Sequence, residues 1–208
     1  DLLNRAALTE ELAIQYGEGA EPLIRLQVEA IFPESVIFEA LREFSQAQPQ
    51  TRIELRQSVL SGTEEAILQR RADLVIGGRV PPGYAGEPLT TIEFIAVAAP
   101  DHTLVQSGNQ LGLEDLRPYR QIVVKDSGQR NLDDGWLGAY QRWSVDSIEL
   151  SIKAVIEGLG FAWLPERKVQ DHIDSGRLVE LPLIEGARRN AQLHLILTNG
   201  EYTSAGVI

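Results

Sequence analysis

The chain has no cysteine and no methionine among its 208 residues. Without cysteine it forms no disulfide and holds no metal through thiolates. The three histidines, His102, His172 and His194, are scattered without metal-ligand spacing, so we expect no metal site. A chain without cysteine fits a reducing compartment, and we expect a cytoplasmic protein.

Long apolar runs are missing too, since none approaches the ~20 residues that cross a bilayer. We therefore expect no membrane contact. The first residues lack a basic stretch followed by an apolar one, so no secretory signal is recognisable, although a removed leader stays open. The chain starts without methionine inside a helical pattern, and we expect it to be part of a longer protein.

Positive charge is scarce, with 19 Lys and Arg against 30 Asp and Glu and a net charge of -11. Such a surface repels a phosphate backbone, so this chain alone is not expected to bind nucleic acid. The hydrophobic fraction of 43% is that of a globular protein, and the length allows one ordinary domain or two small ones.

Motifs of catalysis and of nucleotide binding are also absent. There is no Gly-x-Ser-x-Gly elbow and no P-loop, and the glycines at Gly158 and Gly160 follow a helix where a dinucleotide fingerprint needs a strand. Only Glu29 and Asp126 stand out as acids for general acid–base chemistry. We expect no enzyme and no cofactor, and we expect Arg188 and Arg189 to be solvated charges.

The first third of the chain alternates strand and helix. Residues 24–30 and 51–59 have the alternation of strands, and residues 73–78 form a short buried strand. Helices are expected between them, one through Phe44 and one after the capping residues 61–65. This βαβαβ order predicts a parallel sheet with right-handed crossovers.

The most informative stretch is 145–165, which has the pattern of strand end, helix, turn and buried strand. Asp146 or Ser147 can cap the helix, and Gly158 stands where a helix ends in a left-handed residue. Further strands are predicted at 94–100, 121–125 and 193–197, the last returning toward the first half. Residues 129–144 have no firm pattern.

Several segments, in this order and spacing, resemble the effector-binding domain of LysR-type transcriptional regulators. The resemblance extends from about Ile24 to Leu197. The matching segments are Leu-Gln-Val-Glu-Ala at 26–30, Asp-Leu-Val-Ile-Gly-Gly-Arg at 73–79, Ile-Ala-Val-Ala-Ala-Pro-Asp-His at 95–102, Leu-Glu-Asp-Leu-Arg-Pro at 113–118, Val-Asp-Ser at 145–147, Gly-Leu-Gly-Phe-Ala-Trp-Leu-Pro at 158–165 and Ser-Gly-Arg-Leu-Val at 175–179.

The resemblance implies an α/β fold like that of type 2 periplasmic binding proteins, with two lobes that are each a mostly parallel sheet flanked by helices. Residues 1–23 would be the end of a linker helix and a joint. Lobe I would be 24–97 plus 191–208, and lobe II would be 98–190, with hinges near Val97 and Leu195.

A small-molecule effector would bind between the lobes, where the carboxyl ends of strands meet helix starts. The hydroxyls and cations there could hold a carboxylate. However, the acid and apolar residues at 29–32 stand where the family often has a small hydroxyl residue, which favours an apolar, aromatic or uncharged effector. The expected ligand-binding residues are Ala30, Ile31, Phe32, Ser61, Gly62, Thr63, Arg79, Lys125, Asp126, Ser127, Asp146 and Ser147.

The resemblance also implies a homodimer or homotetramer, in which the helix at 35–44 of one subunit contacts the helix at 148–157 of another. DNA would be bound only through a winged helix-turn-helix domain that this chain does not contain. Two alternatives stay open: a periplasmic-type solute receptor of the same fold, which a signal peptide upstream would indicate, and an enzyme such as a dehydratase.

Overall fold

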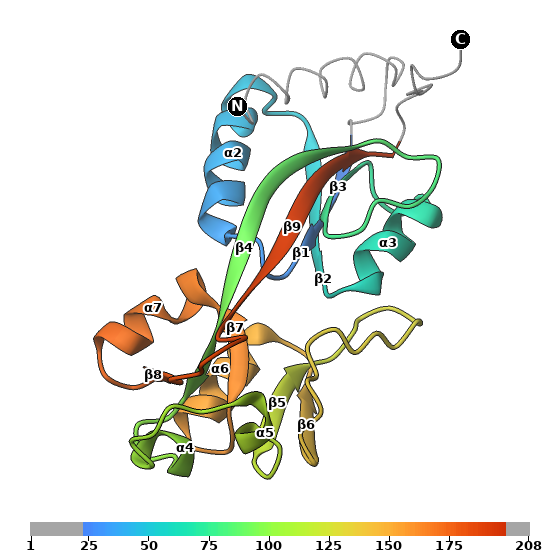
Figure 1. The fold of residues 1–208 in the computed structure, drawn as a ribbon. Helices are drawn as coiled ribbons and strands as arrows, with labels where there is room; N and C mark the ends of the chain where they lie inside the picture. The colour runs from blue at the N-terminus through green and yellow to red at the C-terminus, as the bar shows by residue number, and fades with distance from the viewer. Residues whose placement is uncertain (1–22, 199–208) are drawn as a thin grey trace.

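The structure, a computed structural model, describes residues 23–198. The helix predicted over 1–16 and the end of lobe I beyond 198 lie outside these residues. Figure 1 shows two lobes joined by two long strands, β4 (Gly86–Ala98) and β9 (Arg188–Leu197), which run from one lobe into the other. The expected two-lobed α/β fold is confirmed.

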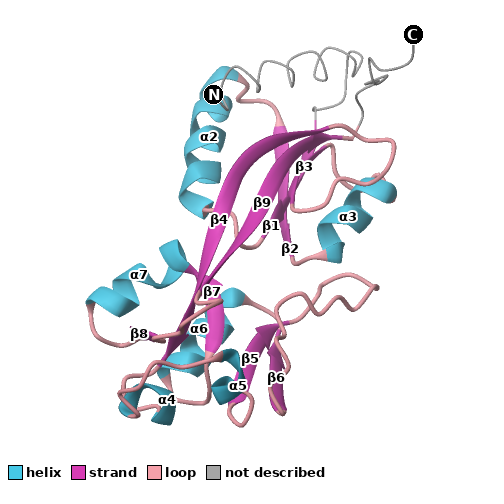
Figure 2. Cartoon of the chain, in the orientation of Figure 1, coloured by secondary structure: helices cyan, strands magenta, loops and turns pink. Residues whose placement is uncertain are grey.

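Lobe I is built on the βαβαβ unit that the alternation predicted. Strands β1 (Leu23–Glu29), β2 (Arg52–Ser58) and β3 (Leu74–Gly77) are parallel, and the sheet order is β2-β1-β3-β9-β4. Helices α2 (Glu34–Ala47) and α3 (Ser61–Leu68) cover opposite sides of this sheet (Figure 2). Ile37 of α2 packs against Val28 and Ile76, and Ile67 of α3 packs against Val75.

Lobe II contains the strand predicted at 121–125 and the helix and buried strand predicted within 145–165, with further strands and helices beside them. Its strands are β5 (Arg120–Val124), β6 (Gln141–Val145), β7 (Ala162–Pro165) and β8 (Val179–Glu180). Strand β6 lies inside the stretch that had no firm pattern, and it pairs in parallel with β5. Strands β7 and β8 pair antiparallel with the end of β4.

The helices of lobe II are α4 (Thr103–Gln106), α5 (Leu113–Leu116), α6 (Ile148–Ile156) and α7 (Glu166–Asp174). Ser147 caps α6 by accepting a hydrogen bond from the N–H of Leu150, and Gly158 after it has φ of +71°, as predicted. Ile148 and Ile152 lie on the buried face of α6 together with Val155. This packing places the start of α6 at the boundary between the lobes.

Strands β4 and β9 pair along nearly their whole length. In lobe I, β9 also pairs with β3 up to His194, and in lobe II, β4 also pairs with β7 from Phe94 onward. Between these points, residues 90–93 pair with 190–193, and among the described residues this segment has no third strand beside it. Val97 and Leu195 lie outside it, next to Ala162 of β7 and Ile76 of β3 respectively.

Within residues 23–198, no helix is long and apolar enough to cross a membrane. The same residues contain no group of three or more acidic, histidine or cysteine side chains that could hold a metal ion.

Candidate functional site

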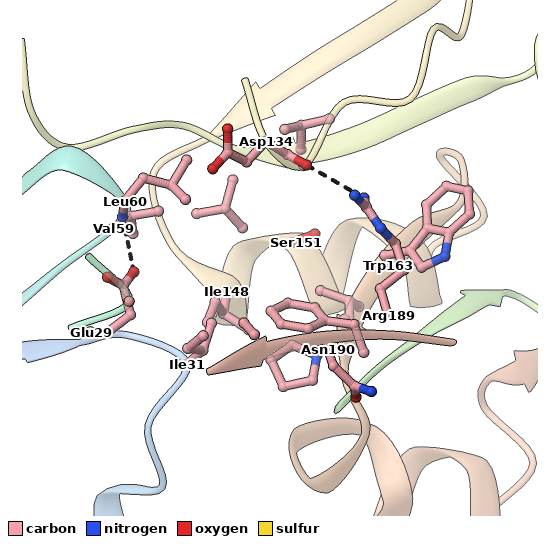
Figure 3. Close-up of a pocket in the computed structure, with 18 of the residues that line it drawn as sticks. Glu29, Ile31, Val59, Leu60, Asp134, Ile148, Ser151, Trp163, Arg189 and Asn190 are labelled. Carbon is pink, nitrogen blue, oxygen red and sulfur yellow. Dashed lines mark hydrogen bonds between the residues drawn. The ribbon is translucent and has the colours of Figure 1, made fainter. Parts of the chain in front are cut away.

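A cavity of about 590 Å³ lies between the lobes (Figure 3). Lobe I contributes Glu29 at the end of β1 and Ile31 after it, the segment before α3, and Gly78 and Arg79 after β3. Lobe II contributes strands β5 and β7 and the buried face of α6. The crossing strands complete the wall. The volume lies within the range of about 300–1,000 Å³ that is typical of small-molecule sites.

Most of the cavity wall is apolar. Ile31 and Leu60 line it from lobe I, and Ile148 and Trp163 line it from lobe II. Trp163 packs edge-on against Phe161, with ring centroids 5.7 Å apart, and its indole N–H donates to the carbonyl of Gly186 at 3.0 Å. Because the indole nitrogen already has a partner, the ring offers the cavity an apolar surface held in place.

Glu29 lies at the lobe I end of the cavity and is 5% exposed. Its carboxylate accepts hydrogen bonds from the N–H of Leu60 at 2.9 Å and from the hydroxyl of Thr63 at 3.3 Å. Burial raises the pKa of Glu29 to about 7, and the nearby charge of Asp126 adds to the rise, against the lowering effect of these two bonds. The group therefore changes its charge near neutral pH.

Cationic side chains reach the cavity at two places. Arg79 forms a 2.6 Å ion pair with Asp134, which comes from the loop between β5 and β6, so this pair joins the two lobes. Arg189 of β9 lies beside Trp163, and its guanidinium donates to the backbone carbonyl of Asp134 at 3.4 Å (Figure 3).

Ser151 is the polar side chain in the wall formed by α6. The residue is fully buried, and its hydroxyl has no hydrogen-bond partner within the described part of the chain. A buried hydroxyl without a partner costs free energy, so a ligand that supplied one would recover it.

The lobes also touch directly beside the cavity. Asp126 follows β5 in lobe II, and its carboxylate accepts from the N–H of Ser61 at 3.0 Å and from the Ser61 hydroxyl at 2.7 Å, at the start of α3 in lobe I. The N–H groups of Gly128 and Leu132 complete four donors. A carboxylate at a helix N-terminus is favoured by the helix dipole.

Burial raises the pKa of Asp126, but the hydrogen bonds from Gly128, Ser61 and Leu132 outweigh it, so the pKa lies below its usual value. Asp126 is therefore held as an anion between the lobes.

A second set of contacts accompanies this carboxylate. The Ser127 hydroxyl accepts from the N–H of Val59 at 2.9 Å, and the Ser127 N–H donates to the Val59 carbonyl at 3.2 Å. Arg130 forms a 2.6 Å ion pair with Glu64 of α3. The loop after β5 is thus bonded along the segment from the end of β2 into α3, and the lobes are closed on this side.

The structure separates the twelve residues expected to bind ligand. Ile31 and Arg79 line the cavity. The others lie elsewhere: Phe32 and Thr63 are buried in lobe I, Ser61, Gly62, Asp126 and Ser127 form the contact between the lobes, Ser147 caps α6, and Ala30, Lys125 and Asp146 lie outside the cavity wall.

The hydroxyls expected to hold a ligand carboxylate are thus occupied by the protein itself. Ser61 donates to Asp126, Ser127 bonds Val59, and Thr63 donates to the Leu60 carbonyl at 2.9 Å. In this conformation these three hydroxyls already have protein partners.

Sequence reasoning missed Arg189, Asp134, Ser151 and Trp163. Arg189 was assigned to solvent together with Arg188, and Asp134 lies in the stretch without a pattern. A signal for Arg189 exists in the sequence, because neighbouring residues of a strand point to opposite faces, so one member of an Arg-Arg pair in a crossing strand faces the cleft.

Two α/β lobes joined by two strands and enclosing a cavity define a two-lobed small-molecule-binding domain. The chain matches the family model described as the LysR substrate binding domain over residues 17–207. It therefore belongs to the LysR substrate-binding domain family, as the resemblance of its motifs indicated.

Curated proteins similar to this chain are named as transcriptional regulators. The chain is 28% identical over 190 residues to the uncharacterized HTH-type transcriptional regulator YeeY of Escherichia coli K12, covering 88% of this chain and 62% of the relative. It is 30% identical to the probable HTH-type transcriptional regulator YhaJ of the same strain, covering 85% and 63%. The chain thus spans a little under two thirds of the length of these relatives.

Solved structures share the fold. The regulatory domain of MetR, a LysR family regulator from Neisseria meningitidis, matches with a TM-score of 0.69 at 22% identity, covering 89% of this chain and 88% of that one. The CcmR regulatory domain of Synechocystis PCC6803 in complex with 2-PG matches with a TM-score of 0.65 at 16% identity, covering 88% and 91%.

Proposed function

We propose that this chain is the effector-sensing part of a LysR-type transcriptional regulator and that a small molecule binds in the cavity between its lobes. The observation that carries the proposal is the cavity of about 590 Å³, largely apolar and with a few polar groups, in a chain of this family. DNA would be bound through a winged helix-turn-helix domain outside this chain, and the whole protein would act in the cytoplasm.

Binding would be coupled to regulation by movement of the lobes. We place the hinge in the segment where residues 90–93 pair with 190–193, because a two-stranded ribbon resists bending less than a sheet held by a third strand. The lobe boundaries expected from sequence, between 97 and 98 and between 190 and 191, lie close to this segment, but residues 94–97 pair with β7 and so lie on its lobe II side. An effector that binds one lobe arrangement better than another shifts the population toward it.

Oligomerisation would transmit this change. Phe38 of α2 is 54% exposed and Leu150 of α6 is 47% exposed, so each helix presents an apolar side chain outside its own lobe. We propose that α2 of one subunit packs against α6 of a second in a homodimer, which could assemble further into a tetramer.

The family and the named regulators favour a sensor over the solute receptor and the enzyme considered from sequence. Of the two acids considered for catalysis, Asp126 is bonded to four donors between the lobes, which is a structural role.

The test is a thermal-shift screen of a metabolite panel. A ligand at 100 times its Kd stabilises by about 2.7 kcal/mol. Ile31→Trp should fill part of the cavity and abolish the shift, whereas Ile184→Trp, the same change at a residue 69% exposed outside the cavity, should keep it. A shift that survives Ile31→Trp would place binding elsewhere, and no shift from any metabolite would count against the sensor.

A further inference from the structure

The cavity has polar groups at two separate ends with an apolar middle. Figure 3 shows Glu29 at one end, Arg189 beside Trp163 at the other, and Ile31 and Ile148 between them. A ligand that fills the cavity therefore meets an acid at one end and a guanidinium at the other.

Arg189 differs from its neighbour Arg188 in how its charge is balanced. Arg188 forms ion pairs with Glu93 at 2.6 Å, Glu166 at 3.0 Å and Glu180 at 3.5 Å. Arg189 points toward the cavity, and within the described residues its guanidinium donates to a backbone carbonyl at 3.4 Å, which is a long contact for a guanidinium. Within the described part of the chain, no carboxylate is paired with Arg189.

The other places that could receive a ligand acid are already filled. Arg79 is paired with Asp134 at 2.6 Å. The N-terminus of α3 holds the Asp126 carboxylate, which accepts from both the N–H and the hydroxyl of Ser61. Arg189 is thus the cation of the cavity wall that has no anion of its own in the described residues.

The opposite end offers hydrogen-bond acceptors. One oxygen of the Glu29 carboxylate accepts from Leu60 and the other has a weaker 3.3 Å contact with Thr63, whose hydroxyl also donates to the Leu60 carbonyl. The second oxygen can therefore take a further donor. Ser151 in the same wall carries a buried hydroxyl with no partner in residues 23–198.

We propose that the cleft binds a bifunctional small molecule, with a carboxylate on Arg189, a hydroxyl or amine at the Glu29 end, and an apolar or aromatic body against Ile148 and Trp163. This rests on the proposed function and narrows its ligand class. It replaces the apolar, aromatic or uncharged effector expected from sequence with an amphiphilic acid, because the structure brings an unmatched guanidinium into the wall.

The test uses a matched set of probes: para-hydroxyphenylacetate, phenylacetate without the hydroxyl, and para-hydroxyphenylacetamide without the acid. Straight-chain ω-hydroxy and ω-amino carboxylates of several lengths extend the set. Affinities are measured by calorimetry or saturation-transfer NMR on the wild-type chain. At least one compound with both groups should bind at least tenfold more tightly than its two truncated analogues, since each loses a charged or hydrogen-bonded contact.

Two variants test whether the ligand carboxylate binds Arg189. Arg189→Gln should weaken the best acid at least tenfold while leaving the affinity of its amide nearly unchanged. Arg188→Gln removes the same charge from the adjacent residue, which faces three glutamates, and should leave both affinities unchanged. Equal losses in the two variants would overturn the assignment, because a general charge effect would then explain them.

The experiments distinguish an incorrect ligand class from an incorrect assignment of the chain as an effector sensor. If no bifunctional acid binds, but metabolites of another class give a thermal shift that Ile31→Trp removes, the cleft is a sensor site and the ligand class is wrong. If nothing in either panel binds, both proposals fall.

Discussion

The carboxylate of Asp126 in lobe II accepts hydrogen bonds from both the backbone N–H and the hydroxyl of Ser61 in lobe I, at 3.0 and 2.7 Å. The protein thus supplies its own anion to the N-terminus of α3. An anion there joins the lobes without a ligand, which means that closure on this side does not depend on the effector.

Asp126→Asn should loosen this contact. An asparagine keeps one acceptor oxygen where the carboxylate has two, so its amide nitrogen must face two of the four donors. These are either the Leu132 N–H and the Ser61 hydroxyl, or the N–H groups of Ser61 and Gly128. The loss should be about 1–3 kcal/mol, felt at the contact between the lobes. Hydrogen exchange should rise at residues 59–62 and 126–132.

The matched control is Asp171→Asn, which removes an exposed carboxylate from α7 of the same lobe. It should change neither the exchange pattern nor the free energy of unfolding by more than a few tenths of a kcal/mol. Unchanged exchange in Asp126→Asn would show that the contact does not hold the lobes together.

Gly128→Ala tests the same contact between the lobes by introducing a steric clash. A Cβ at Gly128 would clash with the Ser61 hydroxyl and lie 2.9 Å from the backbone nitrogen of Gly62, which cannot move aside without shifting α3. The variant should therefore open the lobes, seen as a larger radius of gyration in X-ray scattering. Gly112→Ala, where a Cβ meets nothing closer than 3.6 Å, should keep the wild-type radius.

The sequence predicted most strands of this fold but missed β6. Local signals in the sequence were reliable. The alternation at 24–30 and 51–59 corresponds to strands β1 and β2, and the cap at Ser147 begins helix α6. Strand β6 was missed because Gln141–Val145 is a short, mostly exposed edge strand in which only Trp143 and Val145 are apolar.

The site was harder to predict because it depends on which loops meet. Position at a strand end named Ile31 and Arg79 as cleft residues, and both line the cavity; ligand binding by them stays a prediction. The same rule could not show that the hydroxyls of Ser61 and Ser127 would be bonded by the opposite lobe. Those outcomes depend on contacts between residues more than 60 apart in sequence, as for Ser61 and Asp126.

The proposed subunit contact predicts that Phe38→Glu weakens the dimer. A charge in place of an apolar side chain would have to be buried in the interface without a partner. Sedimentation velocity at tens of micromolar should show dissociation. Leu68→Glu, which changes a side chain of similar exposure, 55%, on α3 in the same lobe, should leave the dimer intact. Dissociation in both variants, or in neither, would contradict the assignment of α2 to the interface.

Glu29 predicts how stability depends on pH. Burial raises its pKa from 4.5 to about 7, so between these values the folded chain keeps a proton that the unfolded chain has lost. The contribution of this group is therefore most favourable below about pH 4.5, falls as the pH rises to 7, and is level above. At ~1.4 kcal/mol for each unit of pKa shift, the free energy of unfolding falls by an amount of the order of 3 kcal/mol.

Glu29→Gln should remove this dependence. A glutamine resembles the protonated acid, since its oxygen can still accept from Leu60 and its amide can donate to the Thr63 hydroxyl. The other charged groups that act on Glu29, Asp126 and Arg79, stay in place. Urea unfolding should find the variant more stable than wild type at pH 8, with the difference shrinking to under ~1 kcal/mol at pH 5.

The loss of stability at low pH distinguishes the contribution of Asp126 from that of Glu29. The pKa of Asp126 is lowered below its usual 3.8, so its contribution is present above that value and is lost only as the pH falls further. Glu29→Gln should therefore keep the wild-type loss of stability in strong acid. Glu43→Gln, at an exposed position of α2, should follow the wild type throughout. A variant at Glu29 that tracked wild type from pH 5 to 8 would show that this carboxyl titrates as an ordinary, solvated acid.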